Sequence, residues 1–237
     1  DPALRAAWQS LTERHGRHKL DQWLTAVNQR SLEIALADAA GVLDGGVLPA
    51  SAIFAAFDGA NPFSAVRQAA FVAQAQALAR TLGAGGKKQQ DAAQGLAAAL
   101  HINDDARAYE AFRAAVFTQA GTPRKLGEVP GLADMADALD AIAQALAQQA
   151  AHEDHQHMVR LSRALLAAYA ALKSERRRVD MNDLERIANT MLSDPVLSGW
   201  VQERLDWKVK HLLIDEFQDT SPLQWQTLHA WLSSYAG

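Results

Sequence analysis

The strongest structural signal lies near the end of the chain, in the stretch Lys208-Val-Lys-His-Leu-Leu-Ile-Asp215-Glu216-Phe-Gln218-Asp219-Thr-Ser-Pro-Leu-Gln224. A short apolar run ending at Ile214 precedes two adjacent acids, and Ser221-Pro222 then opens a helix. Such a run is typical of a buried strand in a parallel sheet. Carboxylates that follow a strand of this kind lie at the sheet edge where α/β proteins bind ligands. The stretch therefore predicts one short strand, residues 208–214, that delivers Asp215 and Glu216 to a ligand site.

Upstream of this stretch the sequence predicts helices and loops. Apolar residues recur at helical spacing, as at Leu4, Trp8 and Leu11, and Gly or Pro residues separate the periodic segments. We expect residues 196–207 to lead directly into the strand. The predicted helices cover residues 2–40, 51–57, 63–82, 89–101, a segment capped by Asp104 or Asp105 and ending at Phe117, residues 132–173, and a segment from the Asp180 cap to Leu192.

Composition narrows the class of protein. Of the 237 residues, 49% are hydrophobic, which is enough for a real core. The 23 Lys and Arg against 27 Asp and Glu give a net charge of −4, so the chain as a whole lacks the basic footprint of a nucleic-acid binder. There is no cysteine, no long apolar run and no signal-peptide pattern, and the chain begins with Asp. We expect an excised piece of a longer protein, located in the cytoplasm and without a membrane partner.

A glycine-rich stretch, Gly83-Ala-Gly-Gly86-Lys87-Lys88, partly resembles a phosphate-binding P-loop. The motif needs a glycine where Thr81 stands and a Ser or Thr where Lys88 stands, and it must follow a strand rather than a helix. The stretch is therefore predicted to be a solvated loop between helices, and the sequence contains no P-loop.

Two polar runs have both a functional and an ordinary interpretation. His152-Glu-Asp-His155-Gln-His157 places two imidazoles on one helical face, but it is one residue short of the zinc-protease spacing, so we assign no metal and favour a solvated helix face. Lys173-Ser-Glu-Arg176-Arg177-Arg178 could contact phosphates, or it could place cations at a helix C-terminus where they suit the dipole.

The acidic turn has the residue types of a nucleotide-hydrolysis site. Mg²⁺ prefers oxygen ligands, and one Asp suffices when phosphates and waters supply the rest, so Asp215 is the candidate metal ligand. Glu216 is the candidate catalytic residue that orients the attacking water. Gln218 and Asp219 are candidates for coupling the nucleotide site to a neighbouring segment. The ordinary alternative is that two acids after a strand simply begin a loop.

The whole run from Leu212 to Gln224 closely resembles motif II of superfamily 1 DNA helicases of the UvrD type. Its Thr-Ser-Pro-Leu-Gln continuation is most similar to the RecB and AddA branch of helicase–nuclease subunits. Tyr169 and Lys173, followed by Val179-Asp-Met-Asn-Asp183-Leu-Glu185, are similar to the segment that precedes motif II in that family, although Met181 and Asn182 depart from the usual Phe and Asp. The stretch from Phe117 to Lys125 is similar to part of the AddA helical insertion.

The resemblance implies a mainly α chain. It implies a helical 1B-type insertion over residues 1–168, followed by a partial RecA-like 1A segment, residues 169–237, whose one short strand belongs to an incomplete α/β core. The intact enzyme would be an ATP-dependent DNA helicase and exonuclease of double-strand-break repair, using ATP and Mg²⁺. The piece alone is predicted to be inactive, because the P-loop is absent.

The resemblance also implies partners. These are single- and double-stranded DNA, the remaining helicase and nuclease domains of the same chain, and a second subunit of a helicase–nuclease complex. Candidate DNA-contacting residues are Lys173, Arg176, Arg177, Arg124 and Lys125. Two alternatives stay open: a helical binding or scaffold module whose acidic turn is only structural, and a metal nuclease with further acids converging on Asp215.

Overall fold

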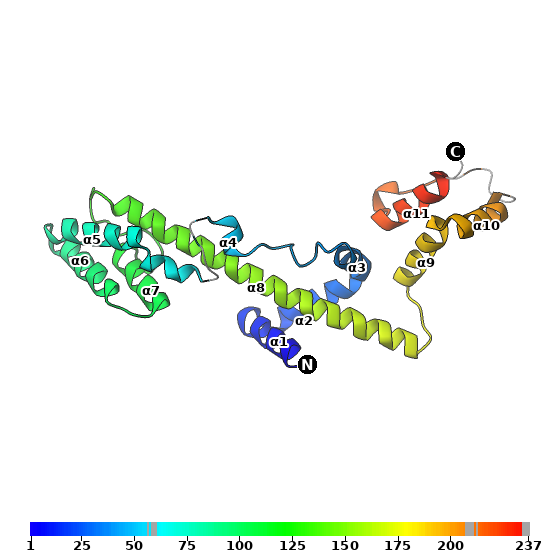
Figure 1. Cartoon of the computed structure of the whole chain (residues 1–237), viewed down its shortest axis with the longest axis horizontal. Helices are drawn as coiled ribbons and strands as arrows, with labels where there is room; N and C mark the ends of the chain where they lie inside the picture. The colour runs from blue at the N-terminus through cyan, green and yellow to red at the C-terminus, as the bar shows by residue number, and fades with distance from the viewer. Residues whose placement is uncertain (56, 58–60, 207–210, 212, 234–237) are drawn as a thin grey trace. The chain divides into compact units, whose positions relative to one another are not determined.

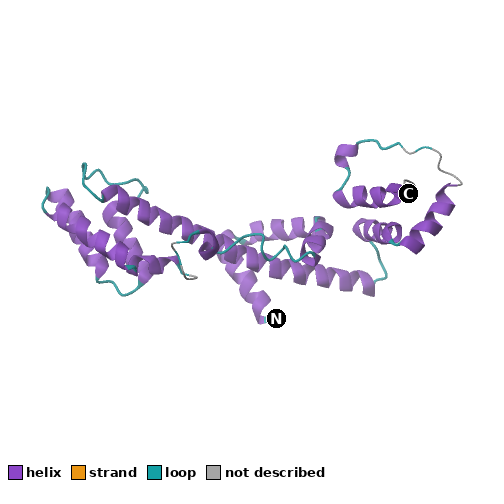
Figure 2. Ribbon diagram, turned by 45° about the horizontal axis from the view of Figure 1, so that its top comes forward, coloured by secondary structure: helices purple, strands orange, loops and turns teal. Residues whose placement is uncertain are grey.

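The computed structural model describes residues 1–55, 57, 61–206, 211 and 213–233, and helices dominate it (Figure 1 and Figure 2). The prediction of a mainly α fold is confirmed. The elements are α1 (Pro2–His15), α2 (Arg17–Gln29), α3 (Ser31–Ala39), α4 (Ala50–Ile53), a 3₁₀ helix η1 (Pro62–Arg67), α5 (Ala69–Gly83), α6 (Lys87–Leu100), α7 (Asp105–Val116), α8 (Leu132–Glu175), α9 (Met181–Ser193), α10 (Pro195–Asp206), a 3₁₀ turn η2 (Phe217–Asp219) and α11 (Pro222–Ser233).

The chain divides into two compact units. The terminal unit comprises Asp1–Leu43 and Arg160–Gly237, and the central unit comprises Asp44–Val159. The long helix α8 therefore contributes its first part to the central unit and its last part to the terminal unit.

The central unit is built on the packing of α5, α6 and α7 with the start of α8 (Figure 1). Apolar side chains at helical spacing form its core, because burying them removes apolar surface from water. Phe71 and Phe112 meet edge to face with ring centroids 5.1 Å apart. Gly95 of α6 lies against Ala115 of α7, and a side chain at Gly95 would bring its Cβ to 3.1 Å from the Ala115 Cβ. The largest fully buried core side chains of this unit include Leu78, Leu82, Leu96, Phe112, Met135, Leu139 and Ile142.

A polar ladder fixes the loop at the start of the central unit. Three side chains one helical turn apart on α8 each bond a backbone carbonyl of that loop: Gln148 to Leu48 at 2.6 Å, His152 to Val47 at 2.7 Å, and Gln156 to Asp44 at 2.9 Å. The interpretation of the His152–His157 run as a solvated helix face is thus wrong for His152 and Gln156, because these side chains are half-buried and engage the loop.

In the terminal unit, short helices pack with the last part of α8 and with one another. The Arg163 guanidinium of α8 holds the Asp38 carboxylate of α3 through two Nε contacts of 3.0 and 3.1 Å. Asn182 Nδ2 donates to Ser31 Oγ at 2.7 Å and joins α9 to α3.

Several predicted boundaries need correction. The predicted helical segment 2–40 is divided at Gly16 and Arg30 into α1, α2 and α3, and the helix predicted over 51–57 ends at Ile53. The expected single helix over residues 63–82 is interrupted at Gln68, where the backbone is extended (φ −62°, ψ 138°) between η1 and α5. Residues 196–207 do not simply lead into a strand, because α10 occupies most of that span. Asp194 begins α10 by accepting hydrogen bonds from the Val196 and Leu197 amides, both at 2.9 Å.

The predicted strand falls largely outside the described residues, which exclude Lys208, Val209, Lys210 and Leu212. The described parts of that segment have no regular secondary structure, and Leu213 is 93% exposed. A strand needs a neighbour to satisfy its amides and carbonyls. Within the described ranges, β-type pairing is limited to an isolated bridge between Phe117 and Pro123.

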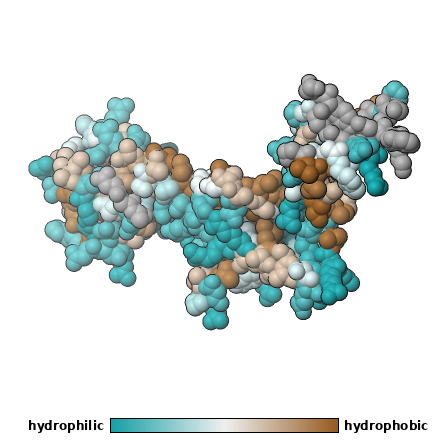
Figure 3. All heavy atoms as spheres, turned by 45° about the vertical axis from the view of Figure 1, so that its right-hand side comes forward, coloured by the Kyte–Doolittle hydropathy of each residue, from teal (hydrophilic) through white to brown (hydrophobic). Residues whose placement is uncertain are grey.

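Large apolar side chains are exposed on the C-terminal part of the terminal unit, and Figure 3 shows hydrophobic surface there. Val196 is 81% exposed, Met181 70% and Trp200 55%. These side chains lie on α9 and α10, which contact one another, and exposed apolar side chains gathered in this way are typical of interaction surfaces. No helix in the described part of the chain combines the length and apolarity needed to cross a membrane.

Candidate functional site

The acidic turn begins with a backbone reversal at Glu216. Its φ of 50° and ψ of 44° are left-handed, a conformation that costs a non-glycine residue about 1 kcal/mol. The Glu216 amide donates to Asp215 Oδ1 at 2.9 Å, which helps to hold this geometry. Both acids are exposed. Two carboxylates therefore face solvent at the entrance to η2.

The structure brings Gln218 to Glu216. The Gln218 side-chain amide donates a short hydrogen bond to Glu216 Oε2. An uncharged amide in this position can orient the carboxylate without neutralising it. The backbone of Asp219 closes η2, and its side chain lies outside the described part of the structure.

Helix α11 fixes the far side of the turn. Ser221 and Gln224 form a reciprocal cap: the Ser221 amide donates to Gln224 Oε1, and the Gln224 amide donates to Ser221 Oγ, both at 3.1 Å. Phe217 packs edge to face on Trp225 with ring centroids 5.1 Å apart. An apolar contact from before the cap to the first turn sets the angle at which the chain enters a helix.

Helix α9 supports α11 in turn. Gln224 Nε2 donates to Glu185 Oε1 at 2.6 Å, and Thr227 Oγ1 donates to Asn189 Oδ1 at 3.1 Å. Leu223 is buried at the same end of α11. The sequence alone indicates no partner for Gln224 or Glu185. The Ser-Pro-Leu-Gln pattern is a local signal for the Ser221–Gln224 cap, whereas the bond from Gln224 to α9 joins residues 39 positions apart.

Lys173 joins the end of α8 to the start of α9. Its ammonium lies 2.9 Å from Asp180 Oδ2 and 2.7 Å from Asp183 Oδ2, and 4.8 Å from the centre of the Tyr169 ring. Asp180 caps α9 by accepting from the Asp183 amide at 2.9 Å, and Asp183 accepts from the Asp180 amide at 3.2 Å. The predicted cap at Asp180 is confirmed.

The charges of this cluster reinforce one another. Burial lowers the pKa of the Lys173 ammonium, but hydrogen bonds to Asp183 and Asp180 outweigh burial and leave that pKa above its ordinary value. The hydrogen bond from Lys173 lowers the pKa of the Asp180 carboxyl to about 2, against the opposing effect of burial. Lys173 therefore has an internal structural partner, and its contact with DNA stays a prediction.

Arg176 and Arg177 lie just beyond the last residue of α8 and are exposed. Arg177 is left-handed, with φ 49°, and the Arg178 amide returns to the Lys173 carbonyl at 2.9 Å. The left-handed Arg177 and this backbone hydrogen bond close the C-terminal end of α8. The negative end of the helix dipole stabilises cations at this end.

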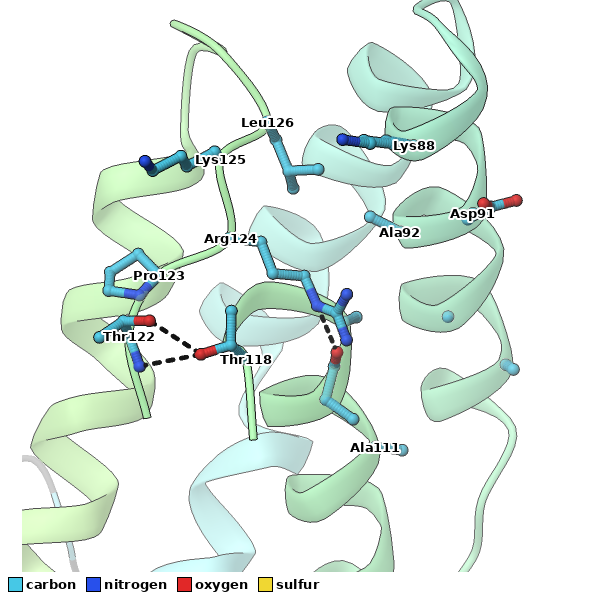
Figure 4. A pocket seen from close by; sticks show the side chains of 14 residues that line it. Lys88, Asp91, Ala92, Ala111, Thr118, Thr122, Pro123, Arg124, Lys125 and Leu126 are labelled. Atoms are coloured by element: carbon cyan, nitrogen blue, oxygen red, sulfur yellow. Dashed lines mark hydrogen bonds between the residues drawn. The ribbon is translucent and has the colours of Figure 1, made fainter. Parts of the chain in front are cut away.

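Arg124 and Lys125 border a groove of about 760 Å³ in the central unit, which Figure 4 shows between α6, α7 and the 118–126 connector. Arg124 Nε donates to the carbonyls of Ala114 and Phe117, each at 2.9 Å, so this side chain caps α7. Lys125 is exposed. The structure thus separates an anchored arginine from a solvent-facing lysine.

Residues 66–235 match the family described as the UvrD/REP helicase N-terminal domain. This match covers most of the chain, including the acidic turn, the Lys173 cluster and the groove. The chain belongs to the UvrD/REP helicase family. No curated protein and no solved structure matches it. UvrD-like helicases as a family bind DNA and use ATP and Mg²⁺.

The carboxylates of the turn suit a magnesium ion in chemistry. Mg²⁺ keeps several waters and takes one or two carboxylates when phosphates complete its shell. No set of three or more His, Cys, Asp or Glu side chains within the described residues could hold a metal.

Proposed function

We propose that this UvrD/REP family chain carries the acidic half of an ATP-hydrolysis site. Asp215 would hold Mg²⁺, which when bound neutralises phosphate charge, and Glu216 would orient and polarise the attacking water. Gln218 would fix the Glu216 carboxylate, and Asp219 would couple the turn to a neighbouring segment. The single observation that carries the proposal is the family match over residues 66–235, which includes the exposed Asp215–Glu216 turn.

The phosphate cradle must come from elsewhere, because these 237 residues contain no P-loop. We infer that residues 1–168 form a 1B-type helical insertion and residues 169–237 part of a RecA-like 1A domain. The exposed apolar residues of α9 to α11 support this division, since an incomplete core leaves such faces uncovered.

The resemblance of the acidic turn to the RecB and AddA branch extends the proposal. The complete enzyme would then be a helicase–nuclease subunit of double-strand-break repair, acting with a second subunit. Lys125, Arg176 and Arg177 are exposed and suited to phosphate contacts, whereas Lys173 and Arg124 would need to exchange internal partners for DNA.

ATP turnover tests the catalytic assignment. The chain alone should show no magnesium-dependent ATPase, and activity of the isolated chain that Glu216→Gln abolishes would contradict the divided site. In the enzyme that also contains the P-loop, Glu216→Gln should reduce turnover about 100-fold or more. Glu203→Gln, which removes an exposed carboxylate of α10, is the matched control and should leave turnover unchanged. Equal rates for both variants would favour a binding or scaffold role.

A further inference from the structure

A basic turn joins α1 to α2 in the terminal unit. Its sequence is Arg14-His15-Gly16-Arg17-His18-Lys19, with three permanent cations, two histidines and no carboxylate in six residues. Arg14, Arg17, His18 and Lys19 are exposed. The turn lies outside residues 66–235, so the family match does not account for it.

The turn is locally basic in an acidic chain. The first 30 residues carry five Lys or Arg against three Asp or Glu, whereas the whole chain has a net charge of −4. Arg17 lies 3.8 Å from Asp21 in an ion pair whose side chains are 78% and 53% exposed. Exposed ion pairs of this kind contribute little to stability, so a phosphate can replace the Asp21 carboxylate.

Trp23 contacts two side chains of the turn, Lys19 and His15. The Lys19 ammonium lies 5.1 Å from the centre of the Trp23 indole, and the His15 ring meets the same side chain at 5.0 Å. Gly16, with φ 82°, allows the chain to reverse direction between the two helices. Side chains that are already ordered lose less conformational entropy when they bind.

Three of the basic side chains lie at the N-terminal end of a helix, where the helix dipole is positive. Arg17, His18 and Lys19 form the first turn of α2, which has no acidic residue and no side-chain cap. Positive side chains at this end oppose the helix dipole. An anion bound at the turn would interact favourably with both the helix dipole and the basic side chains.

We propose that the α1–α2 turn binds the phosphate backbone of DNA, with Arg14, Arg17 and Lys19 as the phosphate-contacting residues. The inference rests on the proposed DNA-binding role of the chain. It adds a contact site to the DNA-contacting residues proposed above, none of which lies in this turn. Arginine and lysine contacts to phosphate are independent of base sequence and weaken as salt rises.

Salt titration of DNA binding tests the site on the 237-residue chain. Fluorescence anisotropy would use a labelled single-stranded oligonucleotide of about 20 nucleotides and the matching duplex, between about 50 and 200 mM salt. The variant Arg14→Gln/Arg17→Gln/Lys19→Gln is compared with Arg80→Gln/Lys87→Gln/Arg107→Gln, which removes three exposed charges of the central unit. Circular dichroism confirms that both variants fold.

The turn variant should bind about tenfold or more weakly at the lower salt concentration. The slope of log affinity against log salt should fall by about 2 for the single strand or about 3 for the duplex, because three phosphate contacts are lost. The control should keep the wild-type slope and affinity.

Three results would overturn the site. Equal losses in the two variants would indicate a general charge effect. The salt slope could stay unchanged in the turn variant while Lys125→Gln/Arg176→Gln/Arg177→Gln loses DNA affinity. That result would reject this turn as a DNA site and leave the proposed function standing. No binding of either DNA probe by the wild-type chain would reject both the turn site and the proposed contact of this chain with DNA, including where polyglutamate or anionic vesicles bind instead. The ATP-hydrolysis assignment is tested separately by turnover.

Discussion

The side-chain amide of Gln224 donates to Glu185 Oε1 over 2.6 Å and joins the first turn of α11 to α9. Gln224 Oε1 also accepts from the Ser221 amide at 3.1 Å. One side chain therefore both caps the helix that follows the acidic turn and ties that helix to its neighbour. Motion of α9 relative to α11 would break this bond, so the acidic turn depends on α9 for its support.

Replacing Gln224 tests this dual role. Gln224→Ala should lower the free energy of unfolding by about 1 kcal/mol, because a cap and an interhelical hydrogen bond are both lost. Hydrogen exchange should become faster at the start of α11 and along α9. Gln226→Ala, an exposed change on the same helix, should have little effect. Matching exchange profiles in the two variants would contradict the role assigned to Gln224.

The Lys173 cluster predicts a specific acid sensitivity. Its hydrogen bond holds the folded pKa of Asp180 at about 2, below the ordinary value of 3.8. A lowered folded pKa stabilises the fold fully above about pH 4, and this stabilisation is lost as the pH falls through about 2. Lys173→Met should lower the free energy of unfolding near neutral pH by about 1–2 kcal/mol, allowing for partial solvent exposure.

Chemical denaturation between about pH 6 and pH 2 measures this effect. The Lys173→Met variant should lose less stability than wild type across the acid range, so the two curves should converge. Lys87→Met, at an exposed position of α6, controls for the loss of one positive charge. Parallel curves for wild type and Lys173→Met would exclude the proposed linkage.

Arg124 and Lys125 should differ sharply despite their adjacency. Arg124→Ala removes the donor to the carbonyls of Ala114 in α7 and of Phe117, the residue that follows α7, and should lower the free energy of unfolding by about 1–2 kcal/mol. Lys125→Ala changes an exposed side chain and should stay within about 0.5 kcal/mol of wild type. Thermal unfolding distinguishes the pair. Similar midpoints would show that Arg124 does not anchor the connector.

Two helical glycines predict opposite outcomes. Gly95→Val places bulk against α7, because even a Cβ at residue 95 would lie 3.1 Å from the Ala115 Cβ, and overpacking of this kind costs about 1–3 kcal/mol. Gly199 in α10 has open space around its Cβ position, so Gly199→Ala should stabilise by about 0.4–1 kcal/mol. Calorimetry checks both signs. A stabilising Gly95→Val would show that α6 and α7 can separate at little cost.

Local signals made the helices predictable, whereas side-chain partners depended on tertiary structure. Asp104 and Asp180 indicate the starts of their helices because capping acts within three residues. The helix predicted to end at Leu192 ends at Ser193, and the Asp194 side chain then begins α10. The predicted boundary was therefore correct, but the helix that follows it was missed.

The candidate site shows the same division. The acids of the turn could be recognised because they stand in one contiguous stretch of sequence. The catalytic roles of Asp215 and Glu216 stay predictions. The contact between Gln224 and Glu185 could not be foreseen, because nothing within one helix indicates which face of α9 it meets. Charge alone likewise could not distinguish Arg124, which is committed to carbonyls, from Lys125, which faces solvent.

The ladder from Gln148, His152 and Gln156 to the 44–48 segment has an evolutionary consequence. Each bond ends on a main-chain carbonyl, so the path of that segment is specified by side chains located about a hundred positions later. Substitutions within 44–48 can accumulate without altering its course, provided that its length is kept. A single insertion in α8 between Gln148 and Gln156 would rotate the ladder out of phase and release several bonds together.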